Sequence, residues 1–223
     1  MMTAAAPVLP VRTPRHGQTR QLLVDTAMRL FRDGGYEKTT MRAIALAAGV
    51  SVGNAYYYFG SKDELVREFY GQLQAEHLAR CLPLLREGQS LGEHLRAILG
   101  AGLDVLGPYH GFGPVFVSAA MGTSVPAGAP ARQASVELFR EAVRRSRPLP
   151  PLAVRASLPD LLSLLHRGIT LYWAYDSSPR QERTRRLIAN GVPLVAKLVV
   201  LARLPVVRKI IEETAGLIRG EKA

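Results

Sequence analysis

Residues 40 to 62 constrain the fold of this chain most, because they have the pattern of two short helices joined by a glycine turn. Thr40 is a candidate N-cap for the first of these helices. Gly49 can end it, since glycine adopts the left-handed conformation without a steric penalty. Ser51 can cap the next helix, over residues 52 to 58. The segment therefore predicts a helix-turn-helix, a motif whose second helix lies in the DNA major groove.

The second of these helices presents polar and aromatic side chains over two turns. Gly53 allows the backbone to approach another molecule closely, and Asn54 can donate and accept hydrogen bonds at a base edge. The hydroxyl groups of Tyr56, Tyr57 and Tyr58 can reach bases or phosphates. This combination favours a helix that contacts DNA.

The segment after residue 60 predicts the start of a third helix. Ser61 and Glu64 have the S-x-x-E spacing of a capping box, in which two side chains satisfy backbone N–H groups at a helix N-terminus. Lys62 lies in the first turn of this helix. Its charge and the outward-pointing N–H groups suit a phosphate group.

The stretch from residue 19 to residue 70 resembles the TetR family of transcriptional regulators in one continuous register. The matching landmarks are Leu30, Phe31, Gly35, Tyr36, Thr39, Thr40, Ile44, Ala45, Ala48, Gly49, Val50, Ser51, Tyr56, Phe59, Lys62 and Leu65. The resemblance covers under a third of the chain. It implies an all-α protein, in which a three-helix DNA-binding head is followed by a helical domain for ligand binding and dimerisation.

The resemblance also implies two kinds of DNA contact. The family's phosphate-contacting positions match Thr40, Tyr57, Tyr58 and Lys62. Its base-facing positions match Arg42, Val52, Gly53, Asn54 and Tyr56. Val52 stands where many members carry a polar residue, so it could instead touch a thymine methyl group. Tyr56 and Tyr58 are equally compatible with partial burial in the core of the head.

A second motif lies in the same segment. Residues 49 to 53 form G-x-S-x-G, the nucleophile elbow of α/β-hydrolases, and Asp160 and His166 follow Ser51 in the matching order. That elbow requires a buried strand before the serine, whereas residues 41 to 48 are rich in alanine and favour a helix. A serine hydrolase therefore stays an alternative, together with a helical interaction protein that does not bind specific DNA.

The composition predicts a soluble, cytoplasmic protein without cofactor or metal. The single cysteine, Cys81, excludes an intrachain disulfide and offers no metal cluster. The longest apolar segment, residues 192 to 202, is interrupted by Lys197 and is too short to span a membrane. Residues 1 to 17 lack a basic region before their apolar residues, so they predict a disordered arm rather than a signal peptide.

The net charge of +11 is distributed unevenly. Residues 1 to 62 hold eight Lys or Arg and three Asp or Glu, an excess that suits DNA. Residues 140 to 223 hold sixteen Lys or Arg and seven Asp or Glu. The second excess includes two clusters, Arg140, Arg144, Arg145 and Arg147, and Arg180, Arg183, Arg185 and Arg186. These arginines either lie on solvent-exposed helix faces without a further role, or they attract an anionic effector or the DNA flanks.

Apolar periodicity and Gly/Pro breaks predict helices along the whole chain, and no segment predicts a strand. Besides the two short helices, the expected helices cover residues 18–33, 62–80, 91–106, 112–121, 131–147, 158–172 and 179 to past 203. The predicted domains are a disordered arm (1–17), a helix-turn-helix DNA-binding domain (18–62) and a helical effector-binding and dimerisation domain (63–223).

The last two predicted helices are long and apolar and are joined by a short turn. Two such hairpins can form a four-helix bundle across a two-fold axis, and the resemblance implies a homodimer interface in this late pair. The predicted interface residues are Leu158, Leu161, Leu162, Leu165, Ile169, Leu187, Leu194 and Leu198. Pro193 should kink or split the last helix. Alternatively, both helices complete the core of the monomer.

By resemblance, the helical domain binds a small molecule, and its candidate pocket residues are Phe112, Phe116, Met121, His166, Tyr172 and Trp173. Residues of these types are more often ordinary core residues, which stays the alternative for each of them. The sequence does not name the effector, which could be apolar or anionic. The expected function is that of a ligand-responsive transcriptional regulator, and the resemblance implies a repressor. Its DNA-binding heads would leave a near-palindromic operator when the effector binds.

Overall fold

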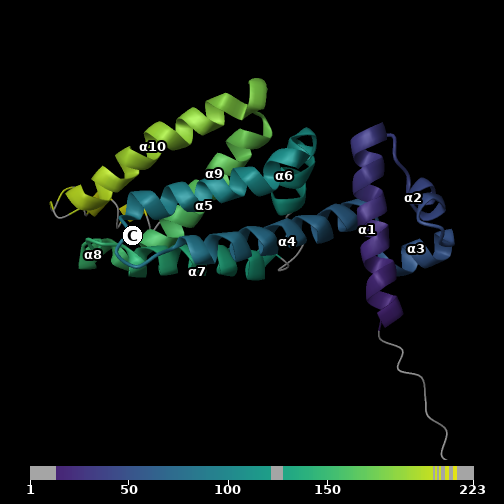
Figure 1. Cartoon of the computed structure of the whole chain (residues 1–223), viewed down its shortest axis with the longest axis horizontal. Helices are drawn as coiled ribbons and strands as arrows, with labels where there is room; N and C mark the ends of the chain where they lie inside the picture. Colours follow the sequence, from purple (N-terminus) through teal and green to yellow (C-terminus); the bar gives the residue numbers. More distant parts are fainter. Residues whose placement is uncertain are drawn as a thin grey trace, which may run out of the picture. The chain divides into compact units, whose positions relative to one another are not determined.

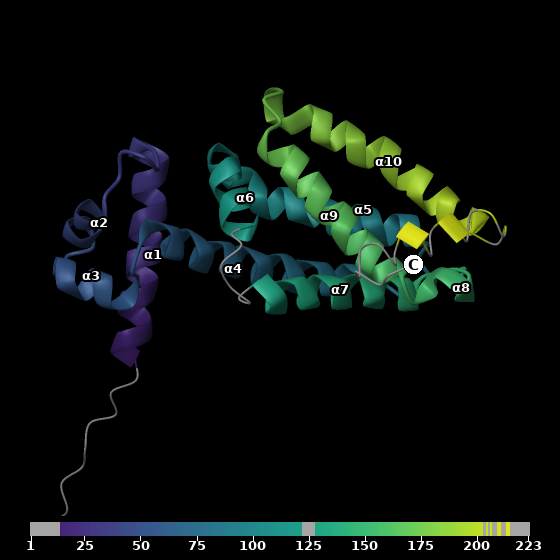
Figure 2. The same cartoon turned by 180° about the vertical axis from the view of Figure 1, so that it is seen from behind.

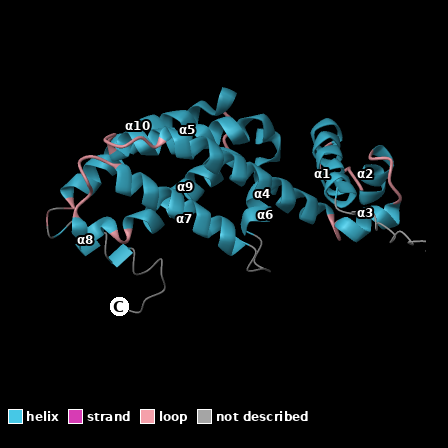
Figure 3. Ribbon diagram, turned by 60° about the horizontal axis from the view of Figure 1, so that its bottom comes forward, coloured by secondary structure: helices cyan, strands magenta, loops and turns pink. Residues whose placement is uncertain are grey.

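The computed structural model of the chain describes residues 14–121, 128–202, 204, 206, 209–210 and 213–214. Every regular element in these residues is a helix, which confirms the predicted all-α fold (Figure 1 and Figure 3). The first helix begins at Pro14, inside the segment that the sequence predicts as a disordered arm. The rest of that arm, residues 1 to 13, lies outside the described residues.

Ten α-helices occur in the described part of the chain. They are α1 (Pro14–Gly34), α2 (Met41–Ala47), α3 (Val52–Tyr58), α4 (Lys62–Cys81), α5 (Leu91–Leu106), α6 (Gly113–Met121), α7 (Gly128–Arg145), α8 (Leu152–Arg155), α9 (Leu158–Ala174) and α10 (Glu182–Leu201). Short 3-10 helices occupy three connections: η1 (Leu82–Leu84), η2 (Gly107–Phe112) and η3 (Pro179–Gln181).

The predicted helix boundaries hold best where a side chain caps the helix. Helix α5 has its predicted bounds, because Ser90 and Glu93 form a capping box at its N-terminus. Gly107 is the C-cap of α5, and the 3-10 helix η2 begins at the same residue. Helix α10 stops at Leu201 rather than past residue 203, and it runs unbroken through Pro193, where the sequence predicts a kink or a split.

The chain divides into two compact units, residues 1–69 and residues 70–223, with the boundary inside α4. In the first unit, α1, α2, α3 and the start of α4 enclose a small apolar core. Phe31, Phe59 and Leu65 are almost completely buried in it. The packing of this core fixes where α2 and α3 lie within the unit.

In the second unit, α5 is a buried helix that other helices cover. Helix α10 lies along α5 (Figure 1 and Figure 2), and a Cβ atom added to Gly92 of α5 would lie 3.6 Å from Cβ of Ala196. Helices α7 and α9 pack along each other, and the hydroxyl of Ser163 donates to Oγ of Ser135 at 3.1 Å. Leu95 of α5 is almost completely buried in the core of this unit.

Helix α9 has two apolar faces, and the chain buries only one of them. The buried face includes Leu158, Leu162 and Ile169, which the sequence predicts as dimer contacts. These three side chains instead complete the core of their own unit. Of the other predicted contacts on α9, Leu161 and Leu165 are half-buried. Both faces are apolar, so periodicity alone does not tell which face packs inside.

Helix α10 is divided in the same way, and here the predicted contacts lie on the outer face. Ile188 and Val192 are buried against the rest of the unit. The predicted interface residues Leu187, Leu194 and Leu198 are exposed, with between 43% and 60% of their surface accessible.

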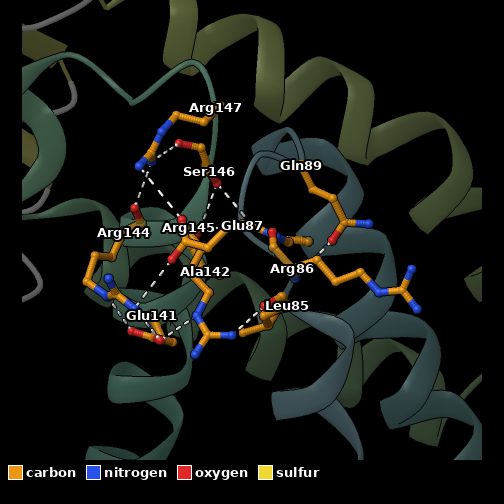
Figure 4. A network of polar contacts seen from close by, with 11 residues as sticks. Leu85, Arg86, Glu87, Gln89, Glu141, Ala142, Arg144, Arg145, Ser146 and Arg147 are labelled. Atoms are coloured by element: carbon orange, nitrogen blue, oxygen red, sulfur yellow. Dashed lines mark hydrogen bonds and ion pairs between the residues drawn. The ribbon is translucent and has the colours of Figure 1, made fainter.

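The end of α7 is bound to the connection between α4 and α5 (Figure 4). Nη1 of Arg145 donates to the carbonyl oxygen of Leu85 at 2.5 Å. The backbone N–H of Arg147 donates to the carbonyl oxygen of Gln89 at 2.8 Å. His94 is fully buried in this region, with Nδ1 2.9 Å from the oxygen of Ala142 on α7. This part of the first arginine cluster thus joins two segments that are far apart in the sequence.

All four arginines of that cluster also pair with carboxylates of the chain. Arg140 pairs with Glu137, Arg144 and Arg145 pair with Glu141, and Arg147 lies 3.7 Å from Glu87. The hydrogen bond from Arg144 is the largest of the effects that lower the pKa of Glu141 to about 2. These pairs favour a structural role for the cluster over attraction of an anionic effector.

Candidate DNA-binding and effector sites

The helix-turn-helix forms as the sequence predicts, and local caps explain its boundaries. Oγ1 of Thr40 accepts a hydrogen bond from the N–H of Ala43 at 3.1 Å, which caps α2. Gly49 follows α2 with a φ of +70°, a conformation that favours glycine. Oγ of Ser51 accepts from the N–H of Asn54 at 3.1 Å, which caps α3.

Helix α3 has one face that holds it to the first unit and one face that is accessible. Ala55 and, just beyond the helix, Phe59 are buried and anchor it. Among the predicted DNA contacts, Val52, Gly53, Asn54, Tyr56 and Tyr57 are exposed, Tyr58 is half-buried, and Thr40 and Arg42 of α2 are exposed. The exposure of Tyr56 answers the open question about its burial. These predicted contacts on α2 and α3, apart from the half-buried Tyr58, are therefore accessible to another molecule.

The fold of the first unit does not require a glycine at position 53. A Cβ atom added there would meet no heavy atom of the described residues within 4 Å, apart from its own helix and its chain neighbours. Alanine would favour the helix more than glycine does. The missing side chain therefore suits close approach of another molecule to the backbone of α3.

Leu46 on α2 is an exposed apolar residue that the sequence analysis does not identify, and 81% of its surface is accessible. The inward positions of α2 are Met41, Ile44 and Ala45, so Leu46 points away from that face. Its place outside the i, i+3, i+4 pattern is the signal that could have identified it. It adds an apolar group to the accessible surface of the helix-turn-helix.

The N-terminus of α4 is partly satisfied by the chain itself. Nζ of Lys62 donates to the carbonyl oxygen of Tyr36 at 2.8 Å and lies 4.3 Å above the ring of that residue. Oγ of Ser61 accepts from the N–H of Glu64, as a capping box requires. The carboxylate of Glu64, however, accepts from the N–H of Gly60 at 2.7 Å rather than from that of Ser61. The predicted reciprocal bond is thus shifted by one residue.

The hydrolase alternative is wrong, because the structure has no nucleophile elbow around Ser51. The elbow requires a strand before the serine, whereas α2 ends only four residues before Ser51. The hydroxyl of Ser51 is engaged as the cap of α3. The residues Asp160 and His166 belong to the other compact unit.

The second unit contains a cavity of about 290 Å³ between α4, α7 and α9. Helix α4 lines it with Gly71, Gln74, Ala75, His77 and Leu78, helix α7 with Ala134, Ser135 and Leu138, and helix α9 with His166. Gly71, Gln74, Ala75 and Leu78 share one face of α4 at the spacing i, i+3, i+4, i+7. The volume lies near the lower end of the range for small-molecule sites, roughly 300–1,000 Å³.

Only one of the six predicted pocket residues, His166, lines this cavity. Phe112 and Phe116 are buried and pack on each other with ring centroids 6.1 Å apart. Tyr172 is exposed, Trp173 lies deeper in the core, and the side chain of Met121 lies outside the described residues. The lining residues Gln74, His77 and Ser135 escape sequence analysis, because polar residues on a helix are ordinarily solvated.

The two histidines of the cavity lie against each other, with ring centroids 5.2 Å apart. His77 donates from Nε2 to the carbonyl oxygen of Ile98 at 2.9 Å, since a carbonyl only accepts. Burial lowers the pKa of His77, although that hydrogen bond opposes the shift. Burial, with smaller contributions from His77 and Arg167, lowers the pKa of His166 to about 3. Both rings are therefore neutral at pH 7.

None of the helices in the described residues combines the length and the apolar character needed to cross a membrane. No group of three or more His, Cys, Asp or Glu side chains in this part of the chain is placed to hold a metal ion.

Two sequence profiles match the chain. Residues 23–69 match the profile described as "Bacterial regulatory proteins, tetR family". Residues 94–217 match the profile described as "Tetracyclin repressor-like, C-terminal domain". The first match lies in the first compact unit, and the second match lies in the second unit.

Individual proteins are similar to parts of the chain or to its fold. The HTH-type transcriptional regulator AcrR of Shigella flexneri is 37% identical over 81 residues, which are 31% of this chain and 38% of AcrR. The chain thus matches well under half the length of this curated relative. A TetR transcriptional regulator from Nitrosomonas europaea has a TM-score of 0.58 and 21% identity, and covers 80% of this chain and 98% of its own. Thermus thermophilus FadR, solved in complex with lauroyl-CoA, has a TM-score of 0.50 and 24% identity, and it covers 77% of this chain and 94% of its own.

Proposed function

The chain belongs to the TetR family of bacterial regulatory proteins, and from this premise we propose that it is a ligand-responsive transcriptional repressor. In this proposal, residues 18–62 bind operator DNA, and residues 63–223 bind an effector and form a homodimer. The protein acts in the cytoplasm, where the DNA is. Effector binding lowers operator affinity by favouring a conformation in which the two heads no longer fit successive half-sites.

The observation that carries the proposal is the accessible face of α3. Three features support DNA contact there: the caps that order the helix, the exposed side chains of Asn54 and Tyr57, and the open space beside Gly53. Asn54 can contact a base edge, and Tyr57 can contact a phosphate. The excess of Lys and Arg in residues 1 to 62 supplies attraction to DNA of any sequence.

The outer faces of α9 and α10 support the dimer. Leu164 and Leu171 on α9 and Leu194 and Leu198 on α10 are large apolar residues with at least 42% of their surface accessible. Exposed apolar surface of this kind marks interaction sites. A two-fold axis beside this hairpin would bury these residues in a four-helix bundle, and it would hold two heads for a near-palindromic operator.

The cavity between α4, α7 and α9 supports the effector site. Its lining is mostly apolar, with Gln74, Ser135 and two histidines as polar groups, the usual character of a small-molecule site. Thermus thermophilus FadR, which has a similar fold, is a TetR family repressor solved in complex with lauroyl-CoA, so this architecture accommodates a small-molecule ligand in at least one protein. Occupancy of the cavity would bias α4, which begins in the head.

The direct test is a selection from random duplex DNA with the purified full-length chain. We expect enrichment of one near-palindromic site, with a spacing of half-sites set by the dimer. The variant Asn54→Ala should lose about 1–3 kcal/mol on the enriched site and little on random DNA. The variant Lys62→Ala should weaken binding to all sequences alike and reduce the salt dependence by about one phosphate contact.

Lys38→Ala serves as the matched control, since Lys38 is exposed in the same unit and is not a predicted contact. It should leave the preference between sequences unchanged. A selection that enriches no sequence would overturn the proposal in favour of a helical interaction protein.

A further inference from the structure

A second, much smaller cavity lies beside the effector cavity. It measures about 10 Å³ and is lined by α5 and α9, with Gly102, Thr170 and Trp173 among its residues. Trp173 is 1% exposed, and its Nε1–H is a buried donor without a hydrogen-bond partner among the described residues. A buried donor without a partner is unfavourable, so this group points to a missing acceptor.

His166 is the partition between the two cavities, because it lines both. Gly102 lies on the other side of this partition. A Cβ atom added to Gly102 would lie 3.6 Å from Nε2 of His166 and 3.4 Å from Nε2 of His77. Neither ring nitrogen of His166 has a hydrogen-bond partner in the part of the chain that the structure describes. A ligand in the larger cavity can reach Trp173 only if this ring turns to another rotamer.

The charge of the lining decides which ligands suit this site. No Asp, Glu, Lys or Arg is among the described residues that line either cavity. An ionised ligand group inside it would lack a partner of opposite charge, and burial of an unpaired charge is strongly unfavourable. Two of the uncharged polar groups of the lining, Trp173 and His166, can bind an uncharged oxygen.

We propose that the effector is an uncharged, largely apolar molecule with one hydroxyl or carbonyl oxygen. This oxygen lies beyond the ring of His166, in the smaller cavity, and accepts a hydrogen bond from Nε1–H of Trp173. The apolar part of this molecule occupies the larger cavity. That cavity follows α4 from Gly71 to Leu78, a length of about 10 Å at 1.5 Å per residue. The inference rests on the proposed effector site and specifies its ligand class.

The test uses four probes that share one scaffold and differ in the head group: 4-butylbenzyl alcohol, 4-butylbenzoate, 4-butylbenzylamine and butylbenzene. Trp173 is the only tryptophan of the chain, so its emission reports on the site alone. Calorimetry measures the same affinities without that fluorophore. We expect the full-length chain to bind the alcohol at least about tenfold more tightly than the benzoate and the benzylamine, since both are charged at pH 7.

Two variants locate the oxygen. Trp173→Phe removes the donor and keeps an aromatic ring. Gly102→Ala places a methyl group in the small cavity. Each should reduce the preference for the alcohol over butylbenzene to under about twofold, from several-fold in the parent chain. Gly100→Ala is the matched control on α5, because a Cβ atom there meets no described heavy atom within 4 Å outside its helix and chain neighbours. It should leave the preference unchanged.

Three results would overturn the inference: binding of the benzoate as tight as that of the alcohol, an alcohol preference that persists in Trp173→Phe and Gly102→Ala, or no binding of any probe. These assays contain no DNA, so they fail independently of the proposed function. A protein that selects an operator but binds no probe loses only the ligand class. A protein that binds the alcohol as expected but selects no DNA loses only the regulatory function.

Discussion

The carboxylate of Asp176 binds both the backbone N–H and the hydroxyl of Thr184, with Oδ2 at 2.8 Å and 2.7 Å from the two donors. Its other oxygen accepts from the N–H and the hydroxyl of Ser178, at 3.0 Å and 2.6 Å. Asp176 is buried. It therefore ties the turn after α9 to the first turn of α10, whose N–H groups have no partner within the helix.

This carboxylate predicts a specific dependence of stability on pH. Burial by itself raises the pKa of Asp176, but the hydrogen bonds from Ser178 and Thr184 outweigh it and depress the folded-state pKa. The unfolded value is about 3.9, so this contribution is fully present above about pH 4 to 5 and is lost as the pH falls toward the folded-state pKa.

Asp176→Asn should therefore cost about 1–3 kcal/mol of unfolding free energy at pH 7 and progressively less below pH 4. Urea unfolding at pH 7 and at pH 3 measures both values. Asp104→Asn is the control, because Asp104 is exposed on α5. An undiminished cost at pH 3 would show that the loss comes from packing rather than from charge.

Gly53→Ala should separate stability from DNA binding. Alanine stabilises a helix relative to glycine by up to about 1 kcal/mol, and the added methyl group has open space. We expect an unchanged or higher melting temperature together with operator binding at least about tenfold weaker, since a methyl group would obstruct the close approach to DNA. Thermal unfolding and a mobility-shift titration decide this. A variant that binds the operator normally would show that Gly53 is not in the interface.

Sequence reasoning predicts a structural feature well when the residues that determine it lie close together in the chain. The bounds of α3 agree with the sequence, because Ser51 and Gly49 act within a few residues of their own positions. The orientation of α9 was not predictable in this way. Leu162 faces the core and Leu164 faces outward, yet both belong to apolar stripes of the same helix. Only the packing of α9 against α7 and α6 decides between them.

The effector cavity is still less accessible to sequence reasoning. Gln74, Ser135 and His166 lie on three helices that are far apart in the chain, and the cavity is the volume that their neighbours leave unfilled. No periodicity records such a volume. Phe112 and Phe116 are predicted pocket residues, whereas the structure buries them and packs them on each other.

Gly113→Ala should destabilise the second unit. A Cβ atom on Gly113 would lie 2.7 Å from Cα and 2.8 Å from the carbonyl oxygen of Ala174, so α6 would have to move away from α9. Overpacking of this kind costs typically about 1–3 kcal/mol. Gly100→Ala, in open space on α5, should instead be neutral or stabilising by up to about 1 kcal/mol. Denaturant unfolding compares the two variants, and equal stabilities would contradict a close approach of α6 and α9.

The last prediction concerns the dimer and uses two exposed leucines. Leu194 lies on the outer face of α10, between Leu187 and Leu198, and 60% of its surface is accessible. If that face packs on a second copy, Leu194→Glu places an unpaired charge near the two-fold axis in each subunit. The dimer should weaken by at least about a hundredfold, which corresponds to about 2.7 kcal/mol. Operator affinity should fall as well, because two separate heads lose the advantage of binding as one unit.

Leu152→Glu is the control for this experiment, since Leu152 on α8 is 80% exposed and is not a predicted interface residue. It should sediment as the parent chain does. Both variants should keep the parent's helical content, because neither leucine is buried in the protomer. A parent chain that sediments as a monomer at micromolar concentration, yet binds a two-half-site operator tightly, would assign the outer face of α10 to some contact other than the dimer.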